Sequence, residues 1–198
     1  HKGQINRTNN KGATLLHMAC SFCKMKAIKI LLKQDGVQVN RAANSGASPL
    51  YVAAERGHTK VVQILLSKSD IDINKAEEEG CTPLYIAAQN GHVQIVQTLL
   101  ARDDIDVNKP EEDGCTPLWM ASQEGHVQIV QTLLTRDDID VNKHNKKNQT
   151  PLNIASDEGH VEVVRLLLSK PNIDINKQDD FRLHFLKDAL HGILSFNF

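Results

Sequence analysis

The chain has 198 residues, of which 40% are hydrophobic, and its formal net charge at pH 7 is -1. This composition allows a substantial buried core and is not typical of disordered chains or of proteins that hold polyanions by charge. No run reaches the 18 or more apolar residues of a membrane span, and the opening HKGQINRTNN lacks the apolar stretch of a secretion signal.

Four cysteines are too few and too irregularly spaced for a disulfide framework, which favours a reducing compartment. We therefore expect an intracellular, cytoplasmic protein. The chain begins at His1 rather than at a methionine, so we also expect it to be either a fragment or a processed form.

A pattern with a step of 34 residues runs through most of the chain. A catalytic site is built once, so tandem copies indicate a structural unit that stacks on its neighbours. The recurring threonine or serine stands at Thr14, Ser48, Thr82, Thr116 and Thr150. Five repeats, numbered 1 to 5 in the following, fit at 8–41, 42–75, 76–109, 110–143 and 144–177.

The two ends of the array are less regular. Residues 1–7 resemble the tail of a preceding repeat, because Ile5-Asn6 matches the ending of the later ones. Residues 178–198 lack Thr-Pro-Leu where the register requires it, so they are either a divergent C-terminal cap or a truncated repeat. Apolar residues at helical spacing predict a helix over 181–194 that covers repeat 5. We expect 1–198 to form a single repeat domain.

The same elements are predicted within each repeat. Thr82 can cap a short helix, with Pro83 at the first helical position, and Gly91 can end it in a left-handed conformation. The following HVQIVQTLL places Val93, Val96, Leu99 and Leu100 on one face of a second helix. An extended segment then leads to a protruding loop or β-hairpin, here called a finger, that opens the next repeat.

TPLYIAAQNGH at 82–92 and TPLWMASQEGH at 116–126 resemble the ankyrin repeat, whose pattern includes T-P-L-H-x-A. The likeness covers 8–177. It implies an all-α repeat solenoid of stacked helix-turn-helix units with protruding β-hairpin or loop fingers. It also implies that protein partners bind the concave face formed by the fingers and first helices. The histidine of the family's Thr-to-His hydrogen bond remains only at His17, and its place is taken elsewhere by Tyr51, Tyr85, Trp119 and Asn153.

The residues that could carry chemistry fit the repeat pattern instead. Cys20 and Cys23 form a lone C-x-x-C at an alanine and a glycine position, and no second pair completes a zinc set. Cys81 and Cys115 are one repeat apart, and helices that stack about 8–10 Å apart are too distant for a disulfide. The same spacing assigns a structural role to the ladder of His58, His92, His126 and His160. We expect no catalytic residues, no cofactor, no metal and no enzymatic activity.

Charge along the fingers is uneven. Finger 2 offers Asn44 and Ser45, fingers 3 and 4 carry three acidic residues each, and finger 5 carries Lys146 and Lys147. This pattern is either an ordinary solvated edge or an acidic surface that selects a partner with exposed Lys or Arg. The rings at positions 85 and 119 would add apolar anchors if partly exposed, or would pack between repeats. The predicted partner-binding residues are Glu77, Glu78, Glu79, Tyr85, Gln89, Asn90, Glu111, Glu112, Asp113, Trp119, Gln123 and Glu124.

Two functions follow from these observations. The first is a monomeric, noncatalytic scaffold that binds another protein, with a basic segment as the candidate ligand at repeats 3 and 4. The alternative is a targeting or regulatory arm of a larger enzyme or channel whose active part lies elsewhere. Near-neutral charge and acidic fingers disfavour nucleic acid, and no membrane insertion is expected.

Overall fold

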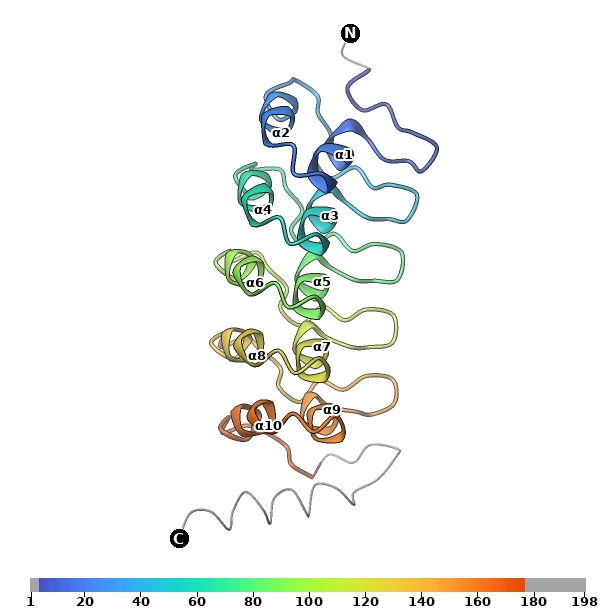
Figure 1. The fold of residues 1–198 in the computed structure, drawn as a ribbon. Coiled ribbons are helices and arrows are strands. Elements are labelled where there is room, and N and C mark those ends of the chain that lie inside the picture. Colours follow the sequence, from blue (N-terminus) through green and yellow to red (C-terminus); the bar gives the residue numbers. More distant parts are fainter. Residues whose placement is uncertain (1–3, 177–198) are drawn as a thin grey trace.

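The computed structural model describes residues 4–176, which form ten short helices and no β-strand. The odd-numbered helices stack in one row beside the fingers, and the even-numbered helices stack in a second row behind them (Figure 1). This arrangement confirms the predicted all-α repeat solenoid. The predictions for 1–3, for the cap at 178–198 and for a helix over 181–194 lie outside the described residues. The helices are α1 (Leu15–Ser21), α2 (Met25–Leu31), α3 (Pro49–Glu55), α4 (Thr59–Leu66), α5 (Pro83–Gln89), α6 (Val93–Leu100), α7 (Pro117–Gln123), α8 (Val127–Leu133), α9 (Pro151–Asp157) and α10 (Val161–Leu168).

The first helix of each repeat begins as the sequence predicts. In α5 the Thr82 hydroxyl accepts a hydrogen bond from the Tyr85 N–H at 3.1 Å, and Pro83 occupies the first turn, where its missing N–H leaves no bond unmade. Gly91 follows the helix with a φ of 74°, a left-handed conformation that a glycine adopts without a Cβ clash. Each first helix is thus fixed at both ends by local chemistry.

The core runs along the array between the two rows of helices. Leu84, Ala87 and Leu99 are fully buried, and small alanines at the position of Ala87 let the first helices approach closely. In α6 the buried face contains Ile95 in place of the predicted Val93, which is half-buried at the start of the helix. Each helix pair therefore covers the apolar face of its neighbour, so stability is close to a sum over repeats and their interfaces.

Asparagine side chains join each repeat to the next. The Asn74 amide donates to the Asp104 carbonyl at 2.7 Å, and its Oδ1 accepts from the Asp106 N–H at 2.8 Å. Both bonds recur, with the same sequence separations, at Asn6, Asn40, Asn108 and Asn142. A side chain that satisfies a backbone donor and acceptor one repeat away fixes the step between repeats.

The histidine ladder forms a second set of links. His92 Nε2 lies 3.1 Å from the Glu55 carbonyl at the end of the preceding first helix, where helical carbonyls lack partners. His58, His126 and His160 make the same contact one repeat apart. The structural role predicted for these histidines is confirmed by this geometry.

The substituted histidine of the sequence motif has different consequences in different repeats. His17 Nδ1 accepts from the Thr14 N–H at 3.1 Å, and Asn153 Oδ1 accepts from the Thr150 N–H at 2.9 Å in the same way. His17 Nε2 also lies 3.1 Å from the Ala47 carbonyl, a bond that Trp119 Nε1 reproduces by donating to the Gln149 carbonyl at 3.0 Å. Asparagine and tryptophan thus each preserve one half of the histidine's role.

The fingers are loops rather than β-hairpins in residues 4–176. Finger 3 is closed by a bond from the Glu77 N–H to the Cys81 carbonyl at 3.1 Å, and the other fingers have the same closure. The nearest feature to a strand pair is an isolated bridge between Thr8 and Thr14. Of the two predicted forms of the finger, the loop is therefore the one observed.

Candidate partner-binding surface

Neighbouring fingers are joined directly through their backbones. The Glu78 N–H donates to the Ser45 carbonyl at 3.1 Å, and the Glu112 N–H donates to the Glu79 carbonyl at 2.9 Å. The Lys146 N–H continues the series by donating to the Asp113 carbonyl at 2.8 Å. These bonds make the finger tips one continuous edge, so the charges on successive tips are held at a fixed spacing.

Two of the six predicted acidic residues do not project from this edge. The Glu77 carboxylate accepts hydrogen bonds from the Glu79 and Cys81 N–H groups, both at 3.0 Å. The Glu111 carboxylate accepts from the Asp113 and Cys115 N–H groups, both at 2.9 Å. Both side chains are half-buried. The prediction that all six acids face a partner is corrected here, because these two brace their own loops.

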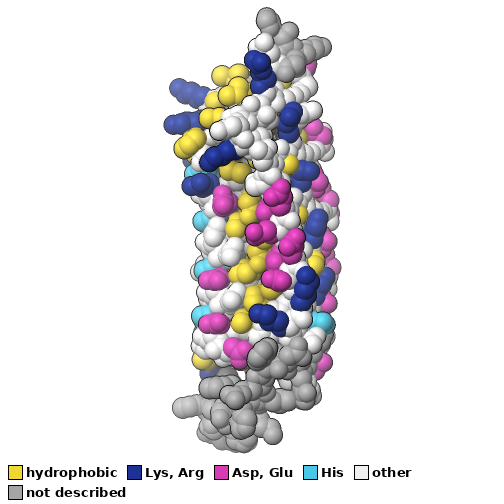
Figure 2. All heavy atoms as spheres, turned by 90° about the vertical axis from the view of Figure 1, so that its right-hand side faces the viewer, with side chains coloured by type: hydrophobic (Ala, Val, Ile, Leu, Met, Phe, Trp, Pro, Cys, Tyr) yellow, Lys and Arg dark blue, Asp and Glu magenta, His cyan; other side chains and the backbone are white. Residues whose placement is uncertain are grey.

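The other four acids, Glu78, Glu79, Glu112 and Asp113, are exposed and form what we call the acidic edge. Figure 2 shows acidic side chains beside a stripe of hydrophobic side chains midway along this face, with basic side chains above them toward the N-terminal end and also below them. Four carboxylates held on two adjoining loops create a local negative field on a chain that is otherwise nearly neutral.

The predicted aromatic anchors are buried. Tyr85 and Trp119 are each 5% exposed and pack in a small cluster with Cys115, Met120 and Ile154 between the fingers and the first helices. Burial raises the pKa of the Tyr85 hydroxyl. The two rings therefore pack between repeats and do not offer exposed anchors, because they fill the space behind the fingers.

The remaining predicted contacts lie at the ends of the first helices. Asn90 and Glu124 are exposed, and the Asn90 amide donates to the Glu55 carbonyl at 3.1 Å. Gln89 and Gln123 are half-buried, and their carbonyls are the partners of His126 and His160. Glu124 thus places an exposed carboxylate at the end of α7.

The four cysteines are free thiols. Burial raises the pKa of Cys20 to about 12, which keeps it protonated at neutral pH and makes it a poor metal ligand. The ligand atoms of Glu77, Glu79 and Cys81 lie within 4.8 Å of one another. Burial and the Glu77 carboxylate also raise the Cys81 pKa to about 12, and Glu77 already accepts two backbone N–H groups, so this set is better suited to bracing the loop than to holding a cation.

One surface was missed by the sequence reasoning. Phe22, at the end of α1, is 65% exposed and borders a groove between fingers 1 and 2. The repeat register places Arg56, Asn90, Glu124 and Glu158 at the corresponding step of the other repeats. A phenylalanine at a position that is otherwise charged or polar was the signal that could have identified it.

Comparison with known protein families identifies the fold directly. The family described as "Ankyrin repeats (3 copies)" matches residues 1–77 and 103–179, and the family described as "Ankyrin repeat" matches residues 79–111. The chain belongs to the ankyrin repeat family. A search of curated proteins gave no match to the chain.

Ankyrin repeats generally mediate protein–protein interaction, and domains built from them are typically noncatalytic. The geometry of the fingers agrees with such a role, because an edge of joined loops holds exposed side chains at a fixed spacing. Among the described helices, none combines the length and the apolar character that crossing a membrane requires.

Proposed function

We propose that the chain is a noncatalytic, monomeric, intracellular interaction module whose fingers and first helices bind a protein segment rich in Lys or Arg at repeats 3 and 4. The observation that carries the proposal is the acidic edge. Its four exposed carboxylates stand on two fingers that are joined by the bond between Glu112 and Glu79. Such a fixed cluster raises the local concentration of a basic ligand and accelerates its association.

The proposal also rests on what surrounds the acidic edge. Lys146 and Lys147 on finger 5 are exposed next to Asp113, and Lys11 stands on finger 1. The sign of the charge therefore changes along the fingers, so a basic segment favours the middle of the array over its ends. This arrangement gives register as well as attraction, because a shifted segment meets like charges.

Charge reversal tests the proposal. We expect Glu78→Lys together with Glu112→Lys to slow the association of a Lys/Arg-rich peptide with the full chain about tenfold at low salt and to flatten its salt dependence. Stopped-flow fluorescence with a labelled peptide measures both quantities. The fold should persist, because exposed loop charges contribute little to stability.

The matched control reverses two acids of the same repeats on another surface. Asp103 and Asp137 are exposed in the loops after α6 and α8, away from the fingers. Asp103→Lys with Asp137→Lys makes the same change in net charge. If this control slows association as much as the finger variant does, the effect is one of net charge and the proposed surface is wrong.

A further inference from the structure

A groove on the finger side lies at repeats 1 and 2. It has a volume of about 660 Å³ and lies between fingers 1 and 2 and the helices α1 and α3. Met18 and Phe22 of α1 and Val52 of α3 contribute its apolar surface. Met18 is 43% exposed, so the apolar floor is open to solvent.

Residue size explains why the groove is wide at this end. The same place three repeats later, between fingers 4 and 5, has a volume of about 230 Å³. Four groove-lining positions carry larger side chains there, because Ala13, His17, Ala47 and Val52 are replaced by Cys115, Trp119, Gln149 and Ile154. The backbone follows the same course in both places. The larger volume at repeats 1 and 2 is therefore due to their smaller side chains.

Phe22 borders two hollows, this groove and an apolar one in repeat 1 that Leu15 and Ile30 also line. Leu15 and Ile30 are also exposed, whereas the corresponding residues of repeat 2, Pro49 and Ile64, are buried and half-buried. The step occupied by Phe22 is different, since Arg56, Asn90 and Glu124 are exposed even though a repeat precedes each of them. Stacking alone thus does not require an apolar side chain there, whereas a bound apolar group would.

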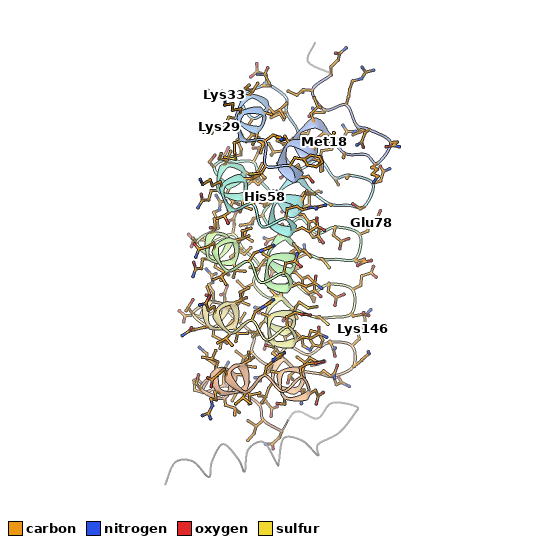
Figure 3. The ribbon with its side chains drawn as sticks, in the orientation of Figure 1. Met18, Lys29, Lys33, His58, Glu78 and Lys146 are labelled. Atoms are coloured by element: carbon orange, nitrogen blue, oxygen red, sulfur yellow. The ribbon has the colours of Figure 1, made fainter. Side chains whose placement is uncertain are left out.

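The groove and the acidic edge lie on the same side of the molecule but differ in charge. Lys11 and Arg56 stand on the groove's rim with Glu55, whose carboxylate lies 3.7 Å from the Arg56 guanidinium. Figure 3 shows Met18 on α1 and Glu78 at its finger tip on this side, whereas Lys29 on α2 and Lys33 just after that helix lie at the opposite side. The rim therefore disfavours a basic group next to the groove, while finger 3, joined to Ser45 of finger 2, favours one a single repeat further on.

We propose that the groove receives an apolar side chain of the same partner segment whose basic residues contact the acidic edge. The partner is then an extended peptide with two parts, a single leucine-like or phenylalanine-like residue and a Lys/Arg cluster. Repeats stack about 8–10 Å apart and the acidic edge lies about 1.5 to 2.5 repeats from the groove, which places the two roughly 12–25 Å apart. At about 3.3 Å per extended residue, the two parts are separated by about four to eight residues. This inference rests on the proposed function and adds the second contact and its spacing.

Synthetic peptides test the two-part partner against the full chain. The probe has one leucine, a spacer of about five serine and glycine residues and a Lys-Arg cluster, and it is made in both sequence orders. Fluorescence anisotropy gives its dissociation constant. We expect one order to bind at least about tenfold more tightly than the same peptide with serine in place of leucine, because burial of one leucine side chain contributes that much.

Variants of the chain locate the leucine. Phe22→Asn, which installs the residue that repeat 3 carries at this step, should reduce the affinity of the two-part peptide to that of the serine peptide and should leave the serine peptide's affinity unchanged. Ile30→Thr is the matched control, because it removes an exposed apolar residue of the same repeat outside the groove and installs the threonine of repeats 3 and 4. It should leave both affinities unchanged.

The outcomes separate this inference from the proposed function. If Glu78→Lys with Glu112→Lys weakens both peptides while Phe22→Asn weakens neither, the acidic edge stands and the groove is not a contact. Equal binding of the leucine and serine peptides in both orders overturns the inference as well. If neither peptide binds, or if neither set of variants changes the affinity, the proposed function and the inference both fail.

Discussion

Cys23 and Gly57 stand at the same step of successive repeats, and both have left-handed backbones, with φ values of 51° and 72°. A glycine takes this conformation at no steric cost, whereas a residue with a Cβ atom is strained by about 1–2 kcal/mol. Repeat 1 therefore ends its first helix with a local cost that repeats 2 to 5 avoid.

A comparison of two substitutions at Cys23 isolates this strain. Both Cys23→Gly and Cys23→Ala remove the thiol, but only alanine keeps the Cβ atom. We expect the glycine variant to have a free energy of unfolding about 1 kcal/mol higher than the alanine variant, as measured by urea denaturation. Equal stabilities would mean that the left-handed conformation is not strained at this site.

Gly125 has a second reason to be glycine. A Cβ atom added there would lie 2.5 Å from His160 Cε1, in addition to the strain of its φ of 68°. The imidazole in its way is the one that contacts the Gln123 carbonyl. We expect Gly125→Ala to lower the free energy of unfolding by about 2–3 kcal/mol, because strain and overpacking add.

Gly159 provides the control for this prediction. It has a similar φ of 76°, but a Cβ atom there would meet no described atom within 4 Å. Gly159→Ala should therefore lower the free energy of unfolding by only about 1 kcal/mol, which is the cost of the left-handed backbone conformation. Calorimetric melting of both variants measures the difference. Equal decreases in the free energy of unfolding for Gly125→Ala and Gly159→Ala would contradict the account.

His17 should make the stability of repeat 1 depend on pH. Burial lowers its pKa below the ordinary 6.5, and its Nδ1 accepts from the Thr14 N–H. A histidine whose pKa is lowered on folding takes up its proton more readily in the unfolded chain, so stability falls as the pH drops below about 6.5. His17→Asn, which installs the residue that repeat 5 carries at Asn153, keeps an acceptor for Thr14 without a titrating group.

The free energies of unfolding of the wild type and of His17→Asn should therefore become more similar as the solution is acidified. We expect the wild type's advantage in free energy of unfolding over His17→Asn to be largest near pH 7.5 and to shrink by pH 5. Guanidinium denaturation of both chains across this range measures the difference. If this advantage stayed constant or grew on acidification, folding would not lower the pKa of His17.

The asparagine links should contribute measurably to coupling between repeats. Asn108 donates to the Asp138 carbonyl at 2.7 Å and accepts from the Asp140 N–H at 2.8 Å. We expect Asn108→Ala to lower the free energy of unfolding by about 1–2 kcal/mol, because it leaves two backbone groups of the next repeat without these bonds. Gln128→Ala, at an exposed position of α8, should change it by less than about 0.5 kcal/mol. Equal effects would assign no special role to the asparagines.

Local rules were sufficient to predict the first helices of the described repeats. Thr82, Pro83 and Gly91 act within one turn of their own position, so their consequences can be read from neighbouring residues. The role of Asn108 could not be read in this way. An asparagine recurs at this step of the repeats, but the partners of Asn108 lie 30 and 32 residues later and meet it only after the repeats have stacked.

The candidate surface was harder to predict, because exposure depends on what packs behind a loop. The acidic run of finger 3 did not separate Glu77, which braces the loop, from Glu78, which faces solvent. A signal was present in the register, since Asn9 and Asn145 occupy the same step as Glu77 and accept the same two backbone bonds. The burial of Trp119 depended on a carbonyl of the next repeat, which no local pattern specifies.

Mapping of the bound peptide most directly tests the claim that the fingers and first helices form the binding face. Hydrogen exchange of the full chain is measured with and without a saturating Lys/Arg-rich peptide. We expect protection of backbone amides in fingers 3 and 4, at 76–81 and 110–115, and none in α6 and α8 on the opposite row (Figure 1). Protection of α6 and α8 with unchanged exchange in the fingers would contradict the account and would place the partner on the other side of the solenoid.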